Sequence, residues 1–480
     1  MHFSIPDTQE FDNSSGNPYV AYNIHINGLF HCSVRYKQLL NLHEQLLKSL
    51  DVPLPSFPPK KFFPLTVNQQ EDRRLALERY IQNIGQNKMI NTSDILNGFL
   101  LSAQQETGGK SIKNESINVV FMNGQSIVVN ISTVDSSKTV LKKICRQLNL
   151  QEQLDVYFAL FMVIINEGHV NVLRRLQDFE SPLITQENIG AFGVRLMFAK
   201  GYWNIGFDME LMRDPVGLEL LYIQTLSEIE QGCIPLNDEV TCRLREAQNR
   251  GEKREFLEVA RTMKYYGYVN FVPCYCDYLY PEAKVIVAIG RNELRLRTVD
   301  ETKAQEAEFK VTRMHCWRIT SLHNNIETSE KTSERSLELS FEYLVAKNQL
   351  EWITISSEQA ILMSVCLQAM IDELLFQNAG ADKAAVLPGK SWTYIMRDGH
   401  SRRLMGSTSS DNICKVSEDE ESGSRKTEPI IKTLVKRFSA GKSNSLSEKR
   451  TTVVEPIRRY TNDCDIMENN AFHTIGDDDL

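Results

Sequence analysis

The sequence predicts a multidomain α+β protein that ends in a disordered tail. Two stretches, residues 3–102 and 115–203, open with strand and hairpin signals and continue with helical periodicity. A helical stretch follows, and a last stretch of alternating strands ends in one apolar helix, which favours separate α+β units. After Gly380 the composition shifts to Ser, Lys, Glu and Gly, which cannot bury a core. With 480 residues, the chain is long enough for about three domains.

The composition excludes several classes of function. The formal net charge is −8, whereas a nucleic-acid-binding domain is usually basic, so we expect no nucleic-acid partner. The ten cysteines are scattered without a C-x-x-C pair, which indicates reduced thiols and no metal site. The longest apolar run, Val156 to Ile165, is about half of what a bilayer-spanning helix needs, and the first residues do not form a signal peptide. No motif of a hydrolase, phosphate loop or dinucleotide fold is present, so we expect neither an enzyme nor a cofactor.

The first unit is predicted to combine a β-hairpin with helices. Residues 19–26 alternate and precede the turn signal Asn27-Gly28, after which residues 29–34 return as the partner strand. Residues 36–50 have apolar positions at helical spacing, and so do residues 71–84. In this interpretation Arg73 and Arg74 lie in the first turn of the second helix, where cations oppose the helix dipole unless an anion binds there.

A proline-rich strap, residues 51–65, connects these two helices. Its five prolines fix φ and remove backbone donors, which predicts an exposed polyproline-like segment. The strap places Lys60 and Lys61 directly beside Phe62, Phe63 and Leu65. Cations next to an apolar tip suit a loop that holds anionic headgroups and inserts its rings into a membrane. The alternative is a stiff connector whose phenylalanines pack inward.

These motifs resemble a family. The pattern R-Y at Arg35-Tyr36, then P-P-K-K, then R-R followed by L-x-x-Y-I is similar to that of PX domains that bind phosphatidylinositol 3-phosphate. The resemblance implies that Arg35 holds the 3-phosphate and that Tyr36 stacks under the inositol ring. It also implies that Lys60 binds on the 1-phosphate side and Arg73 binds the inositol hydroxyls. Lys37 stands where many relatives have Ser or Thr, and it would add a cation. For Arg35 the alternative is a surface salt bridge.

The middle of the chain predicts two further units. Residues 117–121 and 127–131 flank the turn signal Asn123-Gly124, and a helix and strands near 157–165 and 194–198 follow, which makes a ubiquitin-like β-grasp plausible. From Leu211 to Tyr268 the pattern is helical. Strands then resume from Lys284, including residues 311–320 and an alternating run around 337–343, and a helix over 357–377 ends the unit. Many strands capped by one helix are typical of a PH/PTB-like fold.

The succession of grasp, helical and PTB-like units resembles a FERM domain, and the whole chain resembles the PX-FERM sorting nexins. The motifs Y-V-A-Y-N-I-H, F-P-P-K-K, K-Y-Y-G-Y, V-T-R-M-x-C-W-R, F-E-Y-L and the I-G-D-D-D-L ending carry the resemblance. The implied units are a PX domain with a three-stranded sheet (1–108), FERM lobes F1 (115–203), F2 (204–270) and F3 (271–380), and a disordered tail (381–480).

This resemblance implies an endosomal cargo adaptor. It would lie as a monomer on the cytosolic face of early endosomes and return receptors to the plasma membrane, away from lysosomal degradation. F3 would bind NPxY or NxxY motifs in receptor tails, of the lipoprotein receptor family or of integrin β type, along residues 311–320 with Trp317, Ile371 and Leu375. The acidic terminus, with Ile475 and Leu480, would dock the retriever complex. The alternatives are a core role for Trp317, a merely solvated acidic tail, and a FERM scaffold that links receptors to cytoskeleton or signalling proteins.

Overall fold

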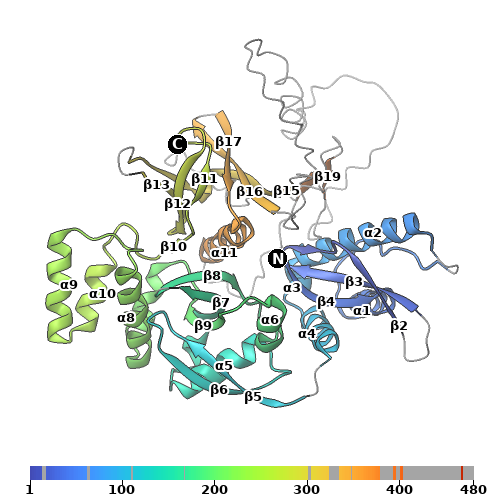
Figure 1. Ribbon diagram of the computed structural model, residues 1–480, viewed down its shortest axis with the longest axis horizontal. Coiled ribbons are helices and arrows are strands. Elements are labelled where there is room, and N and C mark those ends of the chain that lie inside the picture. The colour runs from blue at the N-terminus through green and yellow to red at the C-terminus, as the bar shows by residue number, and fades with distance from the viewer. Residues whose placement is uncertain are drawn as a thin grey trace, which may run out of the picture.

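The structure is a computed structural model. It describes residues 1–12, 18–61, 65–109, 112–166, 168–300, 304–323, 335–346 and 349–378, and three short tail segments, 393–395, 401–403 and 466–468. Figure 1 shows the N-terminal unit beside a cluster of three lobes, with the helix α11 (Ala360–Asn378) near the point where they meet. Among the described helices, none is both long and apolar enough to cross a membrane.

The N-terminal unit is a small antiparallel sheet packed against helices. The predicted hairpin is confirmed, because Asn27 and Gly28 join β3 and β4 with φ of 51° and 82°, as a two-residue turn requires. β4 pairs with one edge of β3, and β2 and the short β1 pair with the other edge. The elements are β1 Phe3–Ser4, β2 Thr8–Asp12, β3 Pro18–Ile26, β4 Leu29–Arg35, α1 Tyr36–Ser49, α2 Val67–Gln86, α3 Lys88–Asn91 and α4 Asp94–Gly108.

The start of α2 differs from the prediction. The helix begins at Val67, because Thr66 and Gln69 form a capping box in which each side chain bonds the other's backbone N–H, at 3.4 and 3.3 Å. Arg73 and Arg74 therefore lie in the second turn and not in the first. The argument from the helix dipole does not apply to them, and their roles rest on their contacts.

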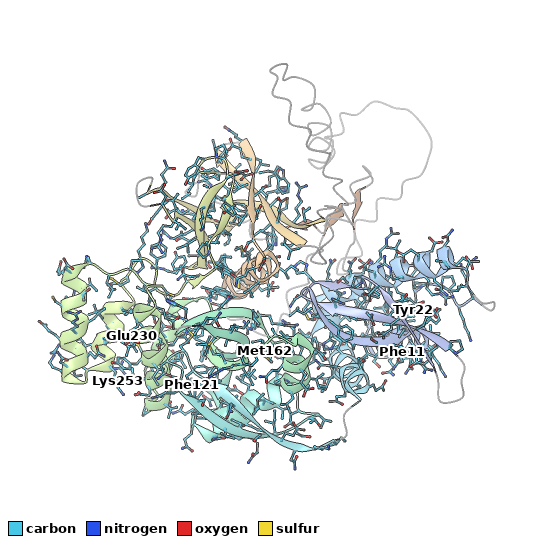
Figure 2. The ribbon with its side chains drawn as sticks, viewed as in Figure 1. Phe11, Tyr22, Phe121, Met162, Glu230 and Lys253 are labelled. Atoms are coloured by element: carbon cyan, nitrogen blue, oxygen red, sulfur yellow. The ribbon has the colours of Figure 1, made fainter. Side chains whose placement is uncertain are left out.

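The next lobe is the predicted β-grasp. Its sheet has the order β6-β5-β9-β7-β8, with β5 and β9 parallel, and α5 packs on it with Val140 and Ile144 buried. The strand β8 was not predicted. Figure 2 shows the side chains that fill these cores, including Tyr22 in the first unit and Met162 in this one. The elements are β5 Asn114–Val120, β6 Ser126–Ser132, α5 Ser137–Gln147, β7 Phe158–Asn166, β8 His169–Arg175, α6 Pro182–Ile189 and β9 Val194–Lys200.

A helical lobe and a strand-rich lobe complete the folded part. The helices are α7 Asp208–Leu211, α8 Pro215–Glu230, α9 Asp238–Arg250 and α10 Lys253–Ala260. The last lobe packs α11 on a sheet of order β14-β13-β12-β11-β17-β16-β15-β20, and β10 pairs with β12. Its strands are β10 Val269–Asn270, β11 Cys274–Cys276, β12 Ala283–Gly290, β13 Glu293–Thr298, β14 Glu306–Lys310, β15 Met314–His323, β16 Arg335–Ala346 and β17 Gln349–Ser356.

Two details of this lobe depart from the prediction. Residues 311–313 form a 3-10 turn, so the strand expected over 311–320 begins at Met314. In the tail, which was expected to be disordered, the structure describes β18 Thr393–Ile395 paired with β19 Ser401–Arg403, and β20 Ile466–Glu468 paired with β15. The remaining tail positions, with Ile475 and Leu480, lie outside the described residues.

Candidate functional site

The proline strap is held against the N-terminal unit by one aromatic ring. Phe57 packs with its centroid 5.1 Å from His43, 4.9 Å from Tyr80 and 5.5 Å from Tyr36. The Tyr36 hydroxyl donates a 2.8 Å hydrogen bond to the carbonyl of Pro58. These contacts fix the strap immediately before Lys60, and they satisfy one of its backbone acceptors without regular secondary structure.

Arg73 lies over the ring of Tyr36 and keeps an unused donor. Its guanidinium carbon is 4.6 Å from the Tyr36 ring centroid, and its Nη2 is buried without a hydrogen-bond partner. A buried donor of this kind costs free energy unless something accepts its hydrogen bond. The neighbouring Arg74 is different, because it pairs with Glu71 at 2.5 Å and Glu78 at 3.6 Å and donates to the carbonyl of Ile5.

Arg35 ends β4 beside a second aromatic ring. Its guanidinium carbon lies 3.2 Å from the ring centroid of Tyr19, and its backbone N–H donates to Gln38 at 2.7 Å. Arg35 pairs in register with Ala21, and Tyr19 lies two residues before Ala21 on the same face of β3. That register is the sequence signal that could have identified Tyr19, which was not among the predicted site residues.

The cations of this region carry no internal counter-charge. Arg35, Lys37, Lys60 and Arg73 form no ion pair with any carboxylate in the part of the chain that the structure describes, and both lysines are exposed. The structure thus joins Tyr36, Arg73 and the strap directly, while Lys37 and Lys60 extend into solvent. Unneutralised cations next to an unsatisfied donor are what an anionic ligand requires.

The apolar tip beside these cations is described only in part. Phe62 and Phe63 lie outside the described residues, and Leu65 is half-buried. Val67, the first residue of α2, is 81% exposed, although its side chain is apolar. Val67 was not among the predicted residues, and its place in the run F-F-P-L-T-V is the sequence signal that could have identified it.

The strand that was predicted to bind a peptide is β15. It packs against α11, and a segment of the C-terminal tail pairs with it. Trp317 is fully buried and its indole N–H donates a 2.9 Å hydrogen bond to Ser364 of α11. Ile371 is 2% exposed and packs in the same core, and Leu375 is partly buried against it. The structure therefore brings the three predicted residues together, with Trp317 beneath the strand and not on an open surface.

One edge of β15 pairs with β16, and the other pairs with β20. Residues 466–468 run antiparallel to it, with Trp317 opposite Met467 and Cys316 opposite Glu468. An extended segment from the C-terminal tail thus occupies the edge to which the sequence assigned a receptor peptide. No part of the sequence pattern had indicated this pairing.

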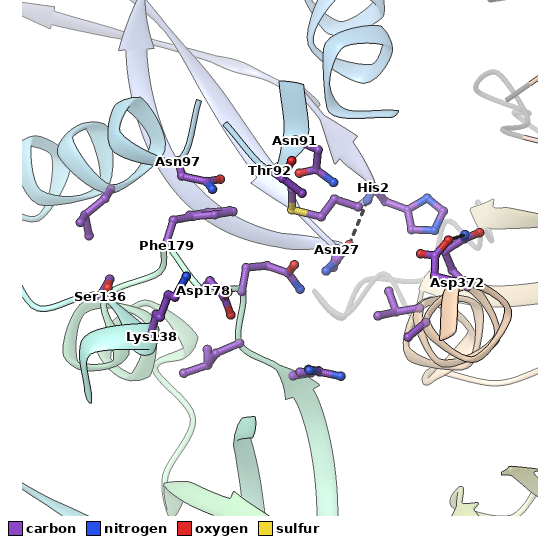
Figure 3. A pocket seen from close by; sticks show the side chains of 18 of the residues that line it. His2, Asn27, Asn91, Thr92, Asn97, Ser136, Lys138, Asp178, Phe179 and Asp372 are labelled. Carbon is purple, nitrogen blue, oxygen red and sulfur yellow. Dashed lines mark hydrogen bonds between the residues drawn. The ribbon is translucent and has the colours of Figure 1, made fainter. Parts of the chain in front are cut away.

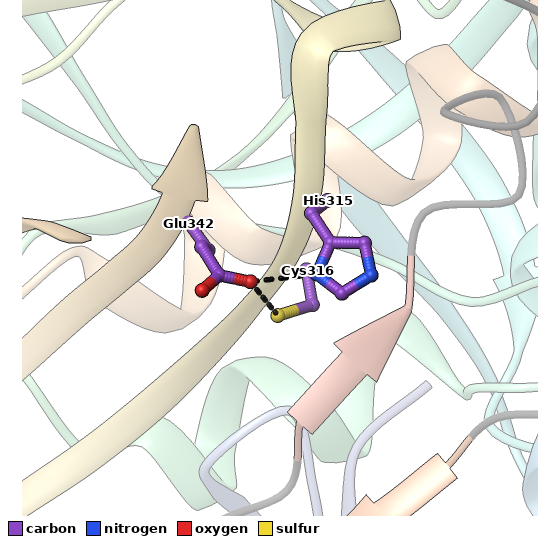
Figure 4. A group of neighbouring side chains, drawn as sticks. All are labelled: His315, Cys316 and Glu342. Atoms are coloured by element: carbon purple, nitrogen blue, oxygen red, sulfur yellow. Dashed lines mark hydrogen bonds and ion pairs between the residues drawn. The ribbon is translucent and has the colours of Figure 1, made fainter. Parts of the chain in front are cut away.

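Strand β15 has a bulge between Met314 and Cys316, where the side chains of His315, Cys316 and Glu342 come together (Figure 4). His315 Nδ1 lies 2.6 Å from a carboxylate oxygen of Glu342, and the Cys316 sulfur lies 3.8 Å from the same atom. The three side chains could hold a metal ion, since their ligand atoms lie within 4.8 Å of one another. The hydrogen bond from His315 also accounts for the burial of Glu342 without a metal.

Family models match along most of the chain. They are described as a PX domain at residues 22–103, the sorting nexin 17/27/31 FERM F1 lobe at 115–203, the sorting nexin 17/31 FERM F2 lobe at 204–264 and the sorting nexin 17 FERM C-terminal domain at 267–375. Sorting nexin-17 of Danio rerio is 38% identical over 492 residues and human sorting nexin-17 is 38% identical over 493, and each match covers 100% of both chains. The chain belongs to the PX-FERM sorting nexin family.

Other relatives agree with this assignment. Human sorting nexin-31 is 30% identical over 428 residues, which cover 88% of this chain and 97% of the relative. As a PX-FERM sorting nexin, the chain is an endosomal sorting adaptor. The PX domain indicates binding to phosphoinositide membranes, and the FERM domain indicates binding to receptor tails. The region around Tyr36 and Arg73 lies in the PX domain, and β15 and α11 lie in the FERM C-terminal lobe.

Proposed function

We propose that this chain binds phosphatidylinositol 3-phosphate on the cytosolic face of early endosomes through Arg35, Tyr36, Lys37, Lys60 and Arg73. The observation that supports this is the buried, unpaired Nη2 of Arg73 beside cations that have no described carboxylate partner. A phosphorylated inositol offers several strong acceptors, so it would satisfy that donor and neutralise the cations together.

We also propose limits for the units of the chain. They are 1–108 for the PX domain, 115–203, 204–270 and 271–380 for the three FERM lobes, and 381–480 for the tail.

Membrane contact would add to headgroup recognition. Phe62, Phe63 and Leu65 follow Lys60 and Lys61 in the sequence, and Val67, which is exposed, continues this apolar run. Insertion of such residues beside cations combines the hydrophobic effect with attraction to anionic lipid. The protein would thus be peripheral, and it would act as a monomeric adaptor and not as an enzyme.

The peptide site is proposed at the edge of β15 that β20 occupies, with α11 as its second wall. The observation that supports it is β20, since an extended segment already pairs there in antiparallel register. An NPxY or NxxY segment of a receptor tail, of lipoprotein receptor or integrin β type, would add its strand in the same way, and its side chains would reach pockets near Trp317, Ile371 and Leu375.

The tail would compete for this edge. The sequence directly after β20 reads Asn469-Asn-Ala-Phe472, which has N-x-x-F spacing close to that of a receptor motif. A receptor peptide and the tail cannot pair with the same edge together, so peptide binding would release residues 466–468. The end of the tail, with Ile475 and Leu480, would then bind the retriever complex and promote return of the receptor to the plasma membrane.

A calorimetric titration of the full chain tests the peptide site. An N-P-x-Y receptor peptide should bind, and its Tyr→Ala form should bind at least about tenfold more weakly, since a buried polar and aromatic anchor is lost. Equal binding of the two peptides would exclude this groove and favour a FERM scaffold that uses another surface. Deleting the last few residues should abolish receptor return to the cell surface but leave peptide binding intact.

A further inference from the structure

The three FERM lobes enclose an apolar cavity of about 130 Å³ that the proposed sites do not use. Its walls come from the β-grasp lobe, from the second half of α8 and the residues that follow it, from β10 and from α11. Cavities of this size in protein interiors can hold a ligand such as benzene when their lining is apolar. The apolar side chains that matter for its shape are Met122, Phe161, Val172, Met197, Leu362 and Val365.

Arg175 places a positive charge at the wall of this cavity. It lies at the end of β8, and its Nη1 donates a 3.0 Å hydrogen bond to the carbonyl of Gly201. No ion pair of Arg175 is found within the described part of the chain, although the adjacent Arg174 is paired with Glu180. Burial lowers the pKa of Arg175, and Asp178, Cys366 and Glu373 offset only part of this effect. An incompletely paired charge in such a place is costly unless a ligand uses it.

Two further donors belong to residues that line the same cavity. The indole Nε1 of Trp203 is buried and has no hydrogen-bond partner. The ammonium of Lys200 lies 5.2 Å from the ring centroid of Tyr202 and 4.9 Å from that of Tyr266. The lining includes one carboxylate, Glu228, whose pKa is raised by burial and which accepts a 2.8 Å bond from Gln224. The cavity is therefore richer in donors and positive charge than in acceptors.

Arg175 also lines a second, larger cleft of about 710 Å³ between the PX domain, the β-grasp lobe and α11 (Figure 3). Val365 and Ala369 of α11 belong to both linings. Arg175 therefore lines both the small apolar cavity and an open polar cleft, whose other charged side chains are Lys138, Asp94, Asp178 and Asp372. This arrangement suits a ligand with an anionic head and a short apolar chain.

We propose that this junction binds a short aliphatic carboxylate, with its carboxylate at Arg175 and the Trp203 N–H and its chain in the apolar cavity. By comparison with cavities that hold benzene, the chain would have about five or six carbons. The Arg175 guanidinium would recognise the carboxylate by charge-assisted hydrogen bonds, and its lost solvation would be restored by the ligand. The proposal does not depend on the lipid or the peptide site.

The test uses the full chain and sodium hexanoate. Hexanoate should raise the unfolding temperature by a few degrees at saturating concentration, since it binds only the folded state. Acetate lacks the chain and 1-hexanol lacks the charge, so neither should do so at the same concentration. In calorimetry, Arg175→Gln should weaken hexanoate binding at least about tenfold, and Ala369→Leu should abolish it by filling the cavity.

Matched controls separate recognition from folding. Arg195→Gln removes an exposed arginine from β9, a strand of the same sheet, and should leave hexanoate binding unchanged. Without ligand, Arg175→Gln should keep or raise the unfolding temperature, whereas a purely structural arginine would lower it. The proposal is overturned if hexanoate does not stabilise the wild-type chain, or if hexanol stabilises it equally. If Arg175→Gln does not fold, the comparison of hexanoate with hexanol and the Ala369→Leu variant decide the question.

Discussion

The neighbouring residues Arg73 and Arg74 give the sharpest test of the lipid site, because the structure assigns them opposite roles. Arg73→Gln removes a guanidinium whose Nη2 is buried without a partner, and Arg74→Gln removes one that pairs with Glu71 and Glu78 and donates to Ile5. The two substitutions remove the same charge from adjacent positions of one helix. Any difference in lipid binding or stability between the two variants therefore results from the different contacts of the two arginines.

For Arg73→Gln we expect a loss of lipid binding without a loss of stability. A charge-assisted hydrogen bond to phosphate or inositol is worth about 1.5–3 kcal/mol, which corresponds to a loss of roughly 10- to 100-fold in affinity. In the lipid-free protein, removing the orphan donor gains about 1–3 kcal/mol, and losing the contact over Tyr36 costs about 0.5–2 kcal/mol. These two effects nearly cancel.

For Arg74→Gln we expect the reverse. Its bond to the Ile5 carbonyl and its pair with Glu78 are largely buried, so their loss should cost about 2–3 kcal/mol of stability. The pair with Glu71 adds little, because Glu71 is 55% exposed. Flotation on vesicles with and without phosphatidylinositol 3-phosphate measures binding, and scanning calorimetry measures unfolding. Lipid binding lost in Arg74→Gln but retained in Arg73→Gln would refute the assignment.

Three further outcomes are expected. Ser364→Ala should lower the stability of the last lobe by about 1–3 kcal/mol in calorimetry, because the Trp317 N–H loses its acceptor. Trp317→Ala should lower the stability by more, about 3–5 kcal/mol, because it empties a buried position. A loss of peptide binding in Trp317→Ala would therefore not prove a direct contact. Met467→Pro should raise the affinity for an N-P-x-Y peptide several-fold in calorimetry, since proline cannot donate to β15; an unchanged affinity would remove the tail from the groove. His31 has its pKa lowered by burial to about 3, so the unfolded chain binds a proton that the folded chain refuses; stability should fall as the pH drops below about 6.5, and this slope should be shallower in His31→Gln.

Local signals in the sequence were enough to predict the elements whose causes are local. The turn at Asn27-Gly28 and the helix that starts at Tyr36 are fixed by neighbouring residues, and both are confirmed. The predicted start of α2 at residue 71 was wrong, because the capping box of Thr66 and Gln69 begins the helix at Val67. The resemblance selected Arg73 without Arg74, but the physical difference between them depends on Ile5, which is far away in the sequence.

Long-range pairing could not be predicted from periodicity. β20 has three residues, and its partner strand lies about 150 residues earlier, so neither length nor alternation identifies it. The same limit applies to Arg175. In the sequence it is an ordinary polar residue of a strand, and only the fold places it in the walls of both the cavity and the cleft. The resemblance placed a peptide site along β15, and only the fold shows that β20 pairs with the edge of that strand.

The contacts of helix α11 bear on how the proposed lipid and peptide sites would act together. A helix that forms one wall of a groove usually has one polar face, but apolar residues occupy most positions around α11, although Asp372 is exposed. The structure shows what covers it: Ser364 contacts His2 of the PX domain at 3.1 Å, and Glu373 accepts from the backbone N–H groups of Trp203 and Asn204 at 3.0 and 2.6 Å. The PX domain and the start of the helical lobe therefore fix the helix that would face a peptide on β15. A groove held in one orientation to a membrane-bound PX domain would present itself to receptor tails on the same membrane, so two weak sites would give strong combined binding without either being tight.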